Sequence, residues 1–174
     1  MGSLMKTKSI LVSFYLGEGV DNRGRVFSDI LNWDYVSIES VHDFIQWLFP
    51  LKVSSAYNGE APILSQDDID EFNKSNELRS NVIKALSLML DFYGFCLESG
   101  HVIRSNHYRE LASNWLSYGN HNMRRITRIL KSLCLLGLND YAQEFFHTLE
   151  SVYKDNPDVI GDSYSYWKNA LKRK

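Results

Sequence analysis

The chain has 174 residues and a mass of 20.2 kDa, which suits one domain or one domain with tails. Its hydrophobic content of 44% and charged content of 23% exclude a disordered chain, and its 3 prolines and 10 glycines exclude collagen-like and linker-dominated proteins. The net charge of -2 is unevenly distributed: residues 1–100 carry 8 basic and 14 acidic side chains, and residues 101–174 carry 11 and 7. The second half therefore has the composition for a basic face, although two ordinary solvated surfaces are the alternative.

The two cysteines, Cys96 and Cys134, are far apart and have no CxxC spacing, so a disulfide framework is not expected. Cys134 lies in an apolar run and is predicted to be a buried thiol. We expect a cytoplasmic or other reducing intracellular compartment, or the nucleus if the source is eukaryotic. No apolar run is long enough for a transmembrane segment. Residues 1–9 are interpreted as a flexible or added N-terminal segment, and residues 10–174 as one domain.

In the first third of the chain, residues 10–16 favour a short helix or an extended segment, and residues 28–33 favour a brief helix. Ser37 is a candidate N-cap for a longer helix that Pro50 ends after Phe49. Its apolar positions follow the i, i+3, i+4, i+7 spacing of a helix and are Val41, Phe44, Ile45 and Leu48. Residues 51–64 look irregular.

The clearest helix start is at Ser65, where Ser65 and Asp68 form a capping box. The acidic residues 67–71 suit a helix N-terminus better than a metal site, because the glycine and ligand spacing of a calcium loop are absent. A long helix is predicted over 76–93, with a wide apolar face typical of a central helix. Gly94 ends it, and residues 95–105 are interpreted as a loop.

Further along, a helix carries Tyr108, Leu111 and Trp115, and residues 117–120 form a tight turn. The next helix, 121–136, has apolar side chains on one face and basic ones on the other. Gly137 ends this helix, and the next one follows Asn139. Asn156-Pro157 then begins a last helix whose apolar residues recur to Leu171. The predicted fold is all-α, a single compact multi-helix bundle with crossing helices.

The start of helix 121–136 is the candidate site for a ligand or partner. Backbone amides and arginines at a helix N-terminus suit a phosphate or a carboxylate, and the basic side chains are expected to be exposed. A solvated basic face that pairs with the acidic first half is the alternative. The candidate residues are Asn120, His121, Asn122, Arg124, Arg125 and Arg128, with Trp47 as a groove wall or a core residue.

Catalytic and cofactor motifs are absent from the sequence: there is no HExxH, GxSxG, Walker loop or GxGxxG. We therefore expect no enzyme, no cofactor and no metal. His42 is interpreted as a hydrogen-bonding residue between helices. A deep pocket with His42, His107 or His121 beside a carboxylate would be the sign of an unrecognised enzyme.

Several motifs in this order and spacing resemble the conserved N-terminal region of the opioid growth factor receptor family, over about residues 14–171. They are residues 29–31 with Trp33, 42–51 (HDFIQWLFPL), 61–64 (APIL), 88–94 (LMLDFYG), 120–133 (NHNMRRITRILKSL) and 136–138 (LGL). The resemblance implies a receptor for a peptide, because the animal member is described as an enkephalin receptor. We expect this member to lack the long repeat-bearing tail of the animal protein.

Two functions remain open from the sequence. The first is a non-enzymatic interaction module that binds a peptide or protein partner, with Arg124, Arg125 and Arg128 anchoring acidic groups. The alternative is a nucleic-acid-binding domain in which residues 108–133 form a helix-turn-helix and helix 121–136 presents the same arginines. The acidic net charge argues against strong DNA affinity.

Overall fold

The structure is a computed structural model that describes residues 6–172. It is mostly helical, which confirms the predicted all-α class, with one small β-hairpin. The first half of the chain contains α1 (Ile10–Tyr15), α2 (Phe27–Leu31), α3 (Tyr35–Ser40), α4 (Ile45–Leu48), α5 (Gln66–Lys74) and α6 (Asn76–Tyr93). The second half contains β1 (Phe95–Glu98), β2 (His101–Arg104), α7 (Tyr108–Leu111), the 3-10 turn Ala112–Asn114, α8 (Asn122–Leu135), α9 (Asn139–Asp155), α10 (Pro157–Ile160) and α11 (Ser163–Ala170).

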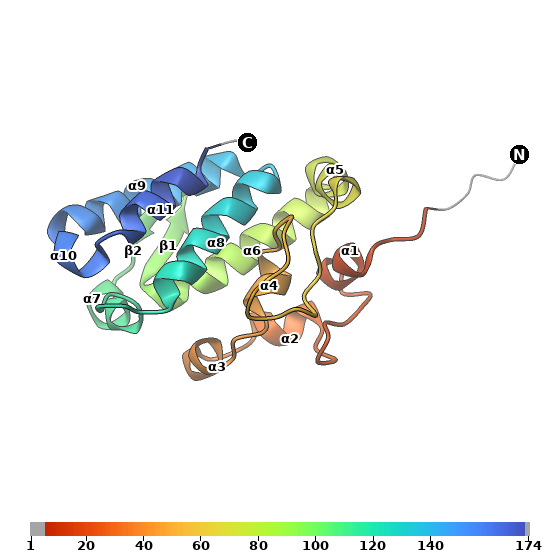
Figure 1. The fold of residues 1–174 in the computed structure, drawn as a ribbon, viewed down its shortest axis with the longest axis horizontal. Helices are drawn as coiled ribbons and strands as arrows, with labels where there is room; N and C mark the ends of the chain where they lie inside the picture. The colour runs from red at the N-terminus through yellow and green to blue at the C-terminus, as the bar shows by residue number, and fades with distance from the viewer. Residues whose placement is uncertain (1–5, 173–174) are drawn as a thin grey trace, which may run out of the picture.

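Helices α6 and α8 run through the middle of the molecule (Figure 1). On one side α6 contacts α1, α2 and α5, and on the other α8 packs against α9 and α11. Every apolar residue that the 3.6-residue period assigns to the inner face of α8, from Ile126 to Leu133, is buried. The two central helices therefore join the halves of the chain around one core.

The starts of α5 and α6 follow the sequence closely. Ser65 Oγ accepts a hydrogen bond from the backbone N–H of Asp68 at 3.1 Å, and Asp68 Oδ2 accepts one from Ser65 N at 3.0 Å. This reciprocal pair confirms the predicted capping box. Helix α6 spans the predicted residues and ends at Gly94, whose φ of +93° is the left-handed conformation that favours glycine.

The segment predicted as a loop after Gly94 is instead an antiparallel hairpin, so that prediction was wrong. Cys96 pairs with Ile103, and the strands are joined by Ser99 and Gly100, which both have positive φ. Two such residues form the tight turn that matches the twist of paired strands. The hairpin forms because Phe95 and Val102 are buried, and it contacts α9.

Two predicted helices are broken in the structure. The helix expected over 37–49 is divided into α3 and α4, because Val41 is extended (φ -90°, ψ 130°) and Asp34 rather than Ser37 caps α3. The helix expected after Asn156 is divided into α10 and α11 at Gly161, whose φ is +53°. A periodic apolar pattern survives a break when both pieces contact the same core.

Large aromatic side chains fill the core. Trp115 and Trp167 are fully buried, and their indole N–H groups donate to Tyr93 O at 3.0 Å and to Met123 O at 3.1 Å. Buried indoles need such partners because an unpaired N–H is costly in an apolar environment. Cys134, predicted to be buried, is partly exposed.

The prediction of a flexible segment over residues 1–9 lies partly outside the described residues and stays a prediction. Within the described part, Lys6 Nζ lies 3.0 Å from Asp67 Oδ2, and Lys8 Nζ lies 2.8 Å from Glu18 Oε2. In residues 6–172 no helix combines the length and the apolar character needed to cross a bilayer.

Gly137 follows α8 with a φ of +80°, and a Cβ added there would collide with Asn73 Oδ1, whereas Gly24, with a φ of +78°, has nothing within 4 Å. We expect Gly24→Ala to lower the free energy of unfolding by about 1 kcal/mol through backbone strain alone. Gly137→Ala is expected to lower it by about 3 kcal/mol, because Asn73 must also move. Urea denaturation measures both losses, and equal losses would show that the contact with Asn73 has no energetic weight.

Candidate functional site

Helix α8 carries the three arginines of the candidate site, and the structure places them in three different environments. Arg124 is exposed, Arg128 is partly buried, and Arg125 is 6% exposed. The expectation that all three form an exposed basic face was therefore wrong for Arg125. Their partners explain the difference.

The guanidinium of Arg125 completes the end of α3. Its Nη1 donates to the carbonyl of Ile38 and its Nη2 to the carbonyl of Val41, both at 2.8 Å. These carbonyls lack helical partners because the chain is extended at Val41. The guanidinium also lies over the ring of Phe44, 5.3 Å from its centroid. Arg125 is thus a structural residue that stabilises the break between α3 and α4.

Arg128 fixes the end of α4 and keeps unused donors. Its Nε donates to the carbonyl of Phe49 at 2.8 Å, and Ser132 Oγ donates to the neighbouring carbonyl of Pro50 at 2.8 Å. Within the described residues, the terminal nitrogens of Arg128 have no hydrogen-bond partner. Burial lowers the pKa of Arg128 to about 10, so the side chain stays charged at neutral pH.

Arg124 lies one turn before Arg128 on the same face of α8. Its Nη1 donates to the hydroxyl of Tyr57, which lies in the irregular segment 51–64 and is 76% exposed. Across residues 6–172, no ion pair joins Arg124, Arg125 or Arg128 to a carboxylate. The sequence alternative, in which these arginines pair with the acidic half of the chain, is therefore not what the structure shows.

The polar residues before α8 are bonded to one another and to Glu39. Asn120 Oδ1 accepts from the backbone N–H of Asn122 at 2.9 Å. Asn122 is fully buried, and its Nδ2 donates to Glu39 Oε2 at 3.0 Å. His121 Nε2 lies 3.0 Å from Glu39 Oε1, and its ring meets that of His42 edge-on at 5.5 Å. Asn120 and Asn122 thus shape the helix start, while the two histidines remain beside the arginines.

Trp47 does not belong to this site. It is 3% exposed, its indole N–H donates to Asn22 Oδ1 at 2.9 Å, and its ring packs on Phe14. Of the two sequence interpretations, the core residue is the one observed. Trp47 is therefore unavailable to a ligand.

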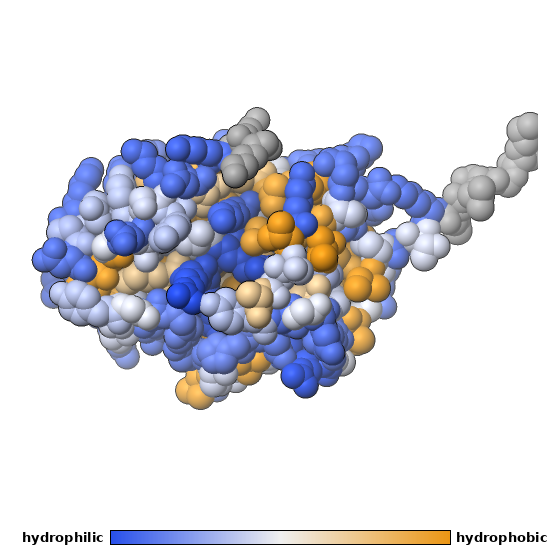
Figure 2. All heavy atoms as spheres, in the orientation of Figure 1, coloured by the Kyte–Doolittle hydropathy of each residue, from blue (hydrophilic) through white to orange (hydrophobic). Residues whose placement is uncertain are grey.

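The arginines line a half-open cavity of about 260 Å³ between α8, α4 and the segment 51–64, here called the arginine pocket. On the face drawn in Figure 2, strongly hydrophilic side chains surround a hollow in this central region, with hydrophobic ones beside it. Its lining residues are His42, Ile45, Gln46, Ser55, Tyr57, His121, Arg124, Arg125 and Arg128. No acidic residue is among them. The Oε1 of Gln46 is buried and has no partner in the described residues.

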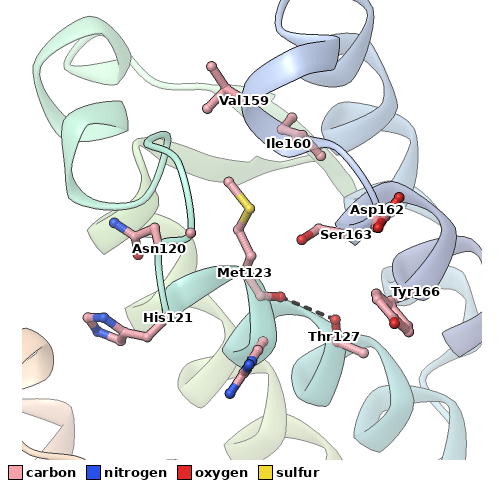
Figure 3. Close-up of a pocket in the computed structure, with 11 residues that line it drawn as sticks. Asn120, His121, Met123, Thr127, Val159, Ile160, Asp162, Ser163 and Tyr166 are labelled. Carbon is pink, nitrogen blue, oxygen red and sulfur yellow. Dashed lines mark hydrogen bonds between the residues drawn. The ribbon is translucent and has the colours of Figure 1, made fainter.

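A second cavity of about 670 Å³, here called the α11 pocket, lies on the other side of Arg124. Met123 points into it from α8 towards Ile160, and Tyr166 of α11 lies further along the wall, near Thr127 (Figure 3). Its wall is mixed, with apolar residues beside hydroxyls and one carboxylate, Asp162. Arg124 and His121 line both cavities, so the two are adjacent.

The predicted sign of an unrecognised enzyme is present in part, since His121 lies in a pocket beside Glu39. However, no hydroxyl in the described residues forms a hydrogen bond with the ring of His42 or His121. Ser55, which lines the same pocket, accepts instead from the backbone N–H groups of Tyr57 and Asn58. Residues 6–172 also contain no group of three metal-ligating side chains. The lining contributes three guanidinium groups, which are the side chains that bind carboxylates and phosphates in proteins.

Sequence reasoning identified the arginines and His121 but missed Tyr57, Gln46 and Glu39. Tyr57 comes from a segment with no periodic pattern, and it meets Arg124 from 67 residues away. No local signal in the sequence predicts this contact. The helix-turn-helix alternative also weakens, because Arg125 is internal and α7 is a single turn.

Comparison with known proteins gives a family for this chain. Residues 5–174 match the model described as the opioid growth factor receptor (OGFr) conserved region. The chain is 42% identical to the opioid growth factor receptor of Rattus norvegicus over 171 residues, which cover 92% of this chain and 29% of the rat protein. Against the Homo sapiens receptor, identity is 37% over 86% of this chain and 23% of the human protein.

A second group of relatives carries a different name. Opioid growth factor receptor-like protein 1 of Xenopus tropicalis is 42% identical over 118 residues, which cover 65% of this chain and 23% of the frog protein. The chain thus spans less than a third of the length of the curated relatives that it matches. No solved structure matches it significantly.

We expect Arg125→Met to lower the free energy of unfolding by about 3 kcal/mol, because the carbonyls of Ile38 and Val41 lose their donors inside the protein. Arg124→Met removes the same charge from the exposed face of the helix and is the matched control, with an expected change within about 0.5 kcal/mol. Urea denaturation measures both. A loss at Arg125 no larger than that at Arg124 would contradict the structural role.

The pKa of His121 is expected to lie below 6.5, because burial lowers it and outweighs the contact with Glu39, which raises it; Arg125 and His42 lower it further. Glu39→Gln should lower this pKa again. The unfolded chain then takes up the proton first, so His121 makes folding less favourable as the pH falls through 6.5 towards the folded pKa. An NMR titration of the imidazole resonances measures the pKa, and a value above 6.5 would refute the assigned balance.

Proposed function

Because the chain belongs to the family defined by the opioid growth factor receptor conserved region, we propose that it is a non-enzymatic module that binds an acidic group of a peptide or protein partner in the arginine pocket. The single observation that supports this proposal is a positively charged cavity with no carboxylate in its lining. Buried charges in proteins are normally paired, because desolvation of an isolated ion costs several kcal/mol. An acidic group from a partner supplies the missing charge.

The neighbouring α11 pocket supports a partner larger than a single ion. Arg124 lines both cavities, so a chain anchored on Arg124 has access to the wall that includes Val159 and Tyr166. That wall offers apolar surface for a side chain of the same partner. A charged anchor beside an apolar contact is typical of peptide recognition.

The names of the relatives agree with a peptide or protein ligand, since they are called receptors for the opioid growth factor. This chain corresponds to less than a third of those proteins, so the activity of a whole receptor is itself a proposal for it. The cysteine spacing favours a reducing compartment, cytoplasmic or nuclear, as its place of action.

Nucleic acid is the second candidate ligand. The feature in its favour is that Arg124 and Lys131 are both exposed on α8, in the basic half of the chain. Phosphodiester groups would contact these two side chains without entering the arginine pocket. Such binding is expected to be weak and strongly salt-dependent.

Selection from a random peptide library displayed on phage tests the proposal, followed by fluorescence anisotropy with the enriched peptides. We expect enriched sequences to contain an acidic residue, and Arg124→Gln to weaken their binding by about tenfold or more, because a charge-assisted hydrogen bond is lost. Arg109→Gln is the matched control: it removes an exposed arginine of α7 that makes no ion pair in the described residues.

Enriched peptides that bind the Arg124→Gln and Arg109→Gln variants with equal affinity would contradict the proposal. A labelled DNA duplex, measured at about 50 mM and about 200 mM salt, separates the second candidate. Tight duplex binding that Lys131→Gln abolishes would favour nucleic acid instead.

A further inference from the structure

The arginine pocket has more positive charge than one carboxylate can neutralise. Arg124, Arg125 and Arg128 line it, and Glu39, the carboxylate whose charge acts on Arg125, lies outside the lining. Both oxygens of Glu39 are already engaged, one by His121 and the other by Asn122. The three arginine charges and the single charge of Glu39 sum to +2, which is the charge that a dianion would neutralise.

The free hydrogen-bond donors also exceed what one carboxylate accepts. Arg128 uses only its Nε, for Phe49 O, and Arg124 uses only one nitrogen, for Tyr57. The two side chains lie one helical turn apart and line the same cavity. One planar guanidinium matches one carboxylate, whereas a phosphate presents three terminal oxygens that accept from several guanidinium groups together.

Tyr57 shows where an oxygen of the ligand would lie. Its hydroxyl accepts the hydrogen bond from Arg124, and its exposed ring comes from a segment without regular structure. A neutral hydroxyl is a weaker acceptor for a guanidinium than an anionic oxygen is. A phosphate oxygen would therefore replace it, and loss of the hydroxyl should help the ligand.

Resting on the proposed function and going one step beyond it, we infer that the acidic group is a phosphomonoester, carried by a phosphorylated side chain of the partner. Arg124 and Arg128 bind its terminal oxygens, and Arg125 contributes charge from beneath.

The test is an NMR titration of the full chain with free amino acids as probes, at about pH 7.5, where a phosphomonoester is largely dianionic. O-phosphoserine and glutamate share the same backbone groups and differ in the side-chain anion. We expect O-phosphoserine to shift the Nε–H resonances of Arg124 and Arg128 and to bind about tenfold more tightly than glutamate. Inorganic phosphate is expected to bind more weakly than O-phosphoserine.

Variants distinguish this pocket from other basic surfaces. Arg124→Gln should weaken binding of O-phosphoserine by about tenfold, while Arg109→Gln should leave it unchanged. Tyr57→Phe keeps the ring, removes the competing hydroxyl and should tighten binding by about twofold or more. Because Arg124 and Tyr57 are exposed, these variants are expected to fold, and a thermal melt checks that they do.

Each opposite result would overturn the inference. Equal binding of glutamate and O-phosphoserine would show that a carboxylate suffices, which leaves the proposed function standing. Equal binding of inorganic phosphate would show that the ligand is a free ion. An affinity for O-phosphoserine that is unchanged in Arg124→Gln would show that the phosphate binds elsewhere on the surface. The proposed function itself fails in a different experiment, the peptide selection.

Discussion

The buried guanidinium of Arg125 is the interaction on which the rest of this structure depends. It donates to the carbonyls of Ile38 and Val41, at the place where α3 ends and the chain turns towards α4. Without these donors, carbonyls inside the protein would be left unpaired, at a cost of about 3 kcal/mol, which is a large share of the roughly 5–15 kcal/mol by which domains are typically stable. One side chain of α8 therefore decides where a helix in the other half of the chain stops.

The contact between α8 and the α3–α4 region also places positive charge in the wall of the arginine pocket. Arg128 and Ser132 hold the carbonyls of Phe49 and Pro50, so α8 is attached to the α3–α4 region along its length. These bonds join residues between 79 and 87 positions apart. Because the arginines bond to neutral carbonyls, their charges remain uncompensated. The arginines that bond the carbonyls at the ends of α3 and α4 thus also give the arginine pocket its positive charge.

The arginine pocket is formed by two helices on one side and by an irregular segment on the other. The floor belongs to α8 and α4, which are fixed by buried hydrogen bonds, whereas the outer wall comes from the irregular segment 51–64. Binding residues commonly lie on such segments when a rigid scaffold positions them. Tyr57, the exposed residue of this wall, is held by one hydrogen bond to Arg124. A ligand that binds Arg124 therefore has to displace only this one hydrogen bond.

The sequence predicts the helical class, the boundaries of α6, the capping box of α5 and the apolar face of α8, because each depends on residues within a few positions of one another. It did not determine the hairpin after Gly94, which depends on the burial of Phe95 and Val102, or the break at Val41. The tertiary structure alone decided that Arg125 is internal, that Trp47 is core and that Tyr57 meets Arg124. Helical periodicity assigns a side chain to a face, but only the packing of distant segments decides whether that face meets water or another part of the chain.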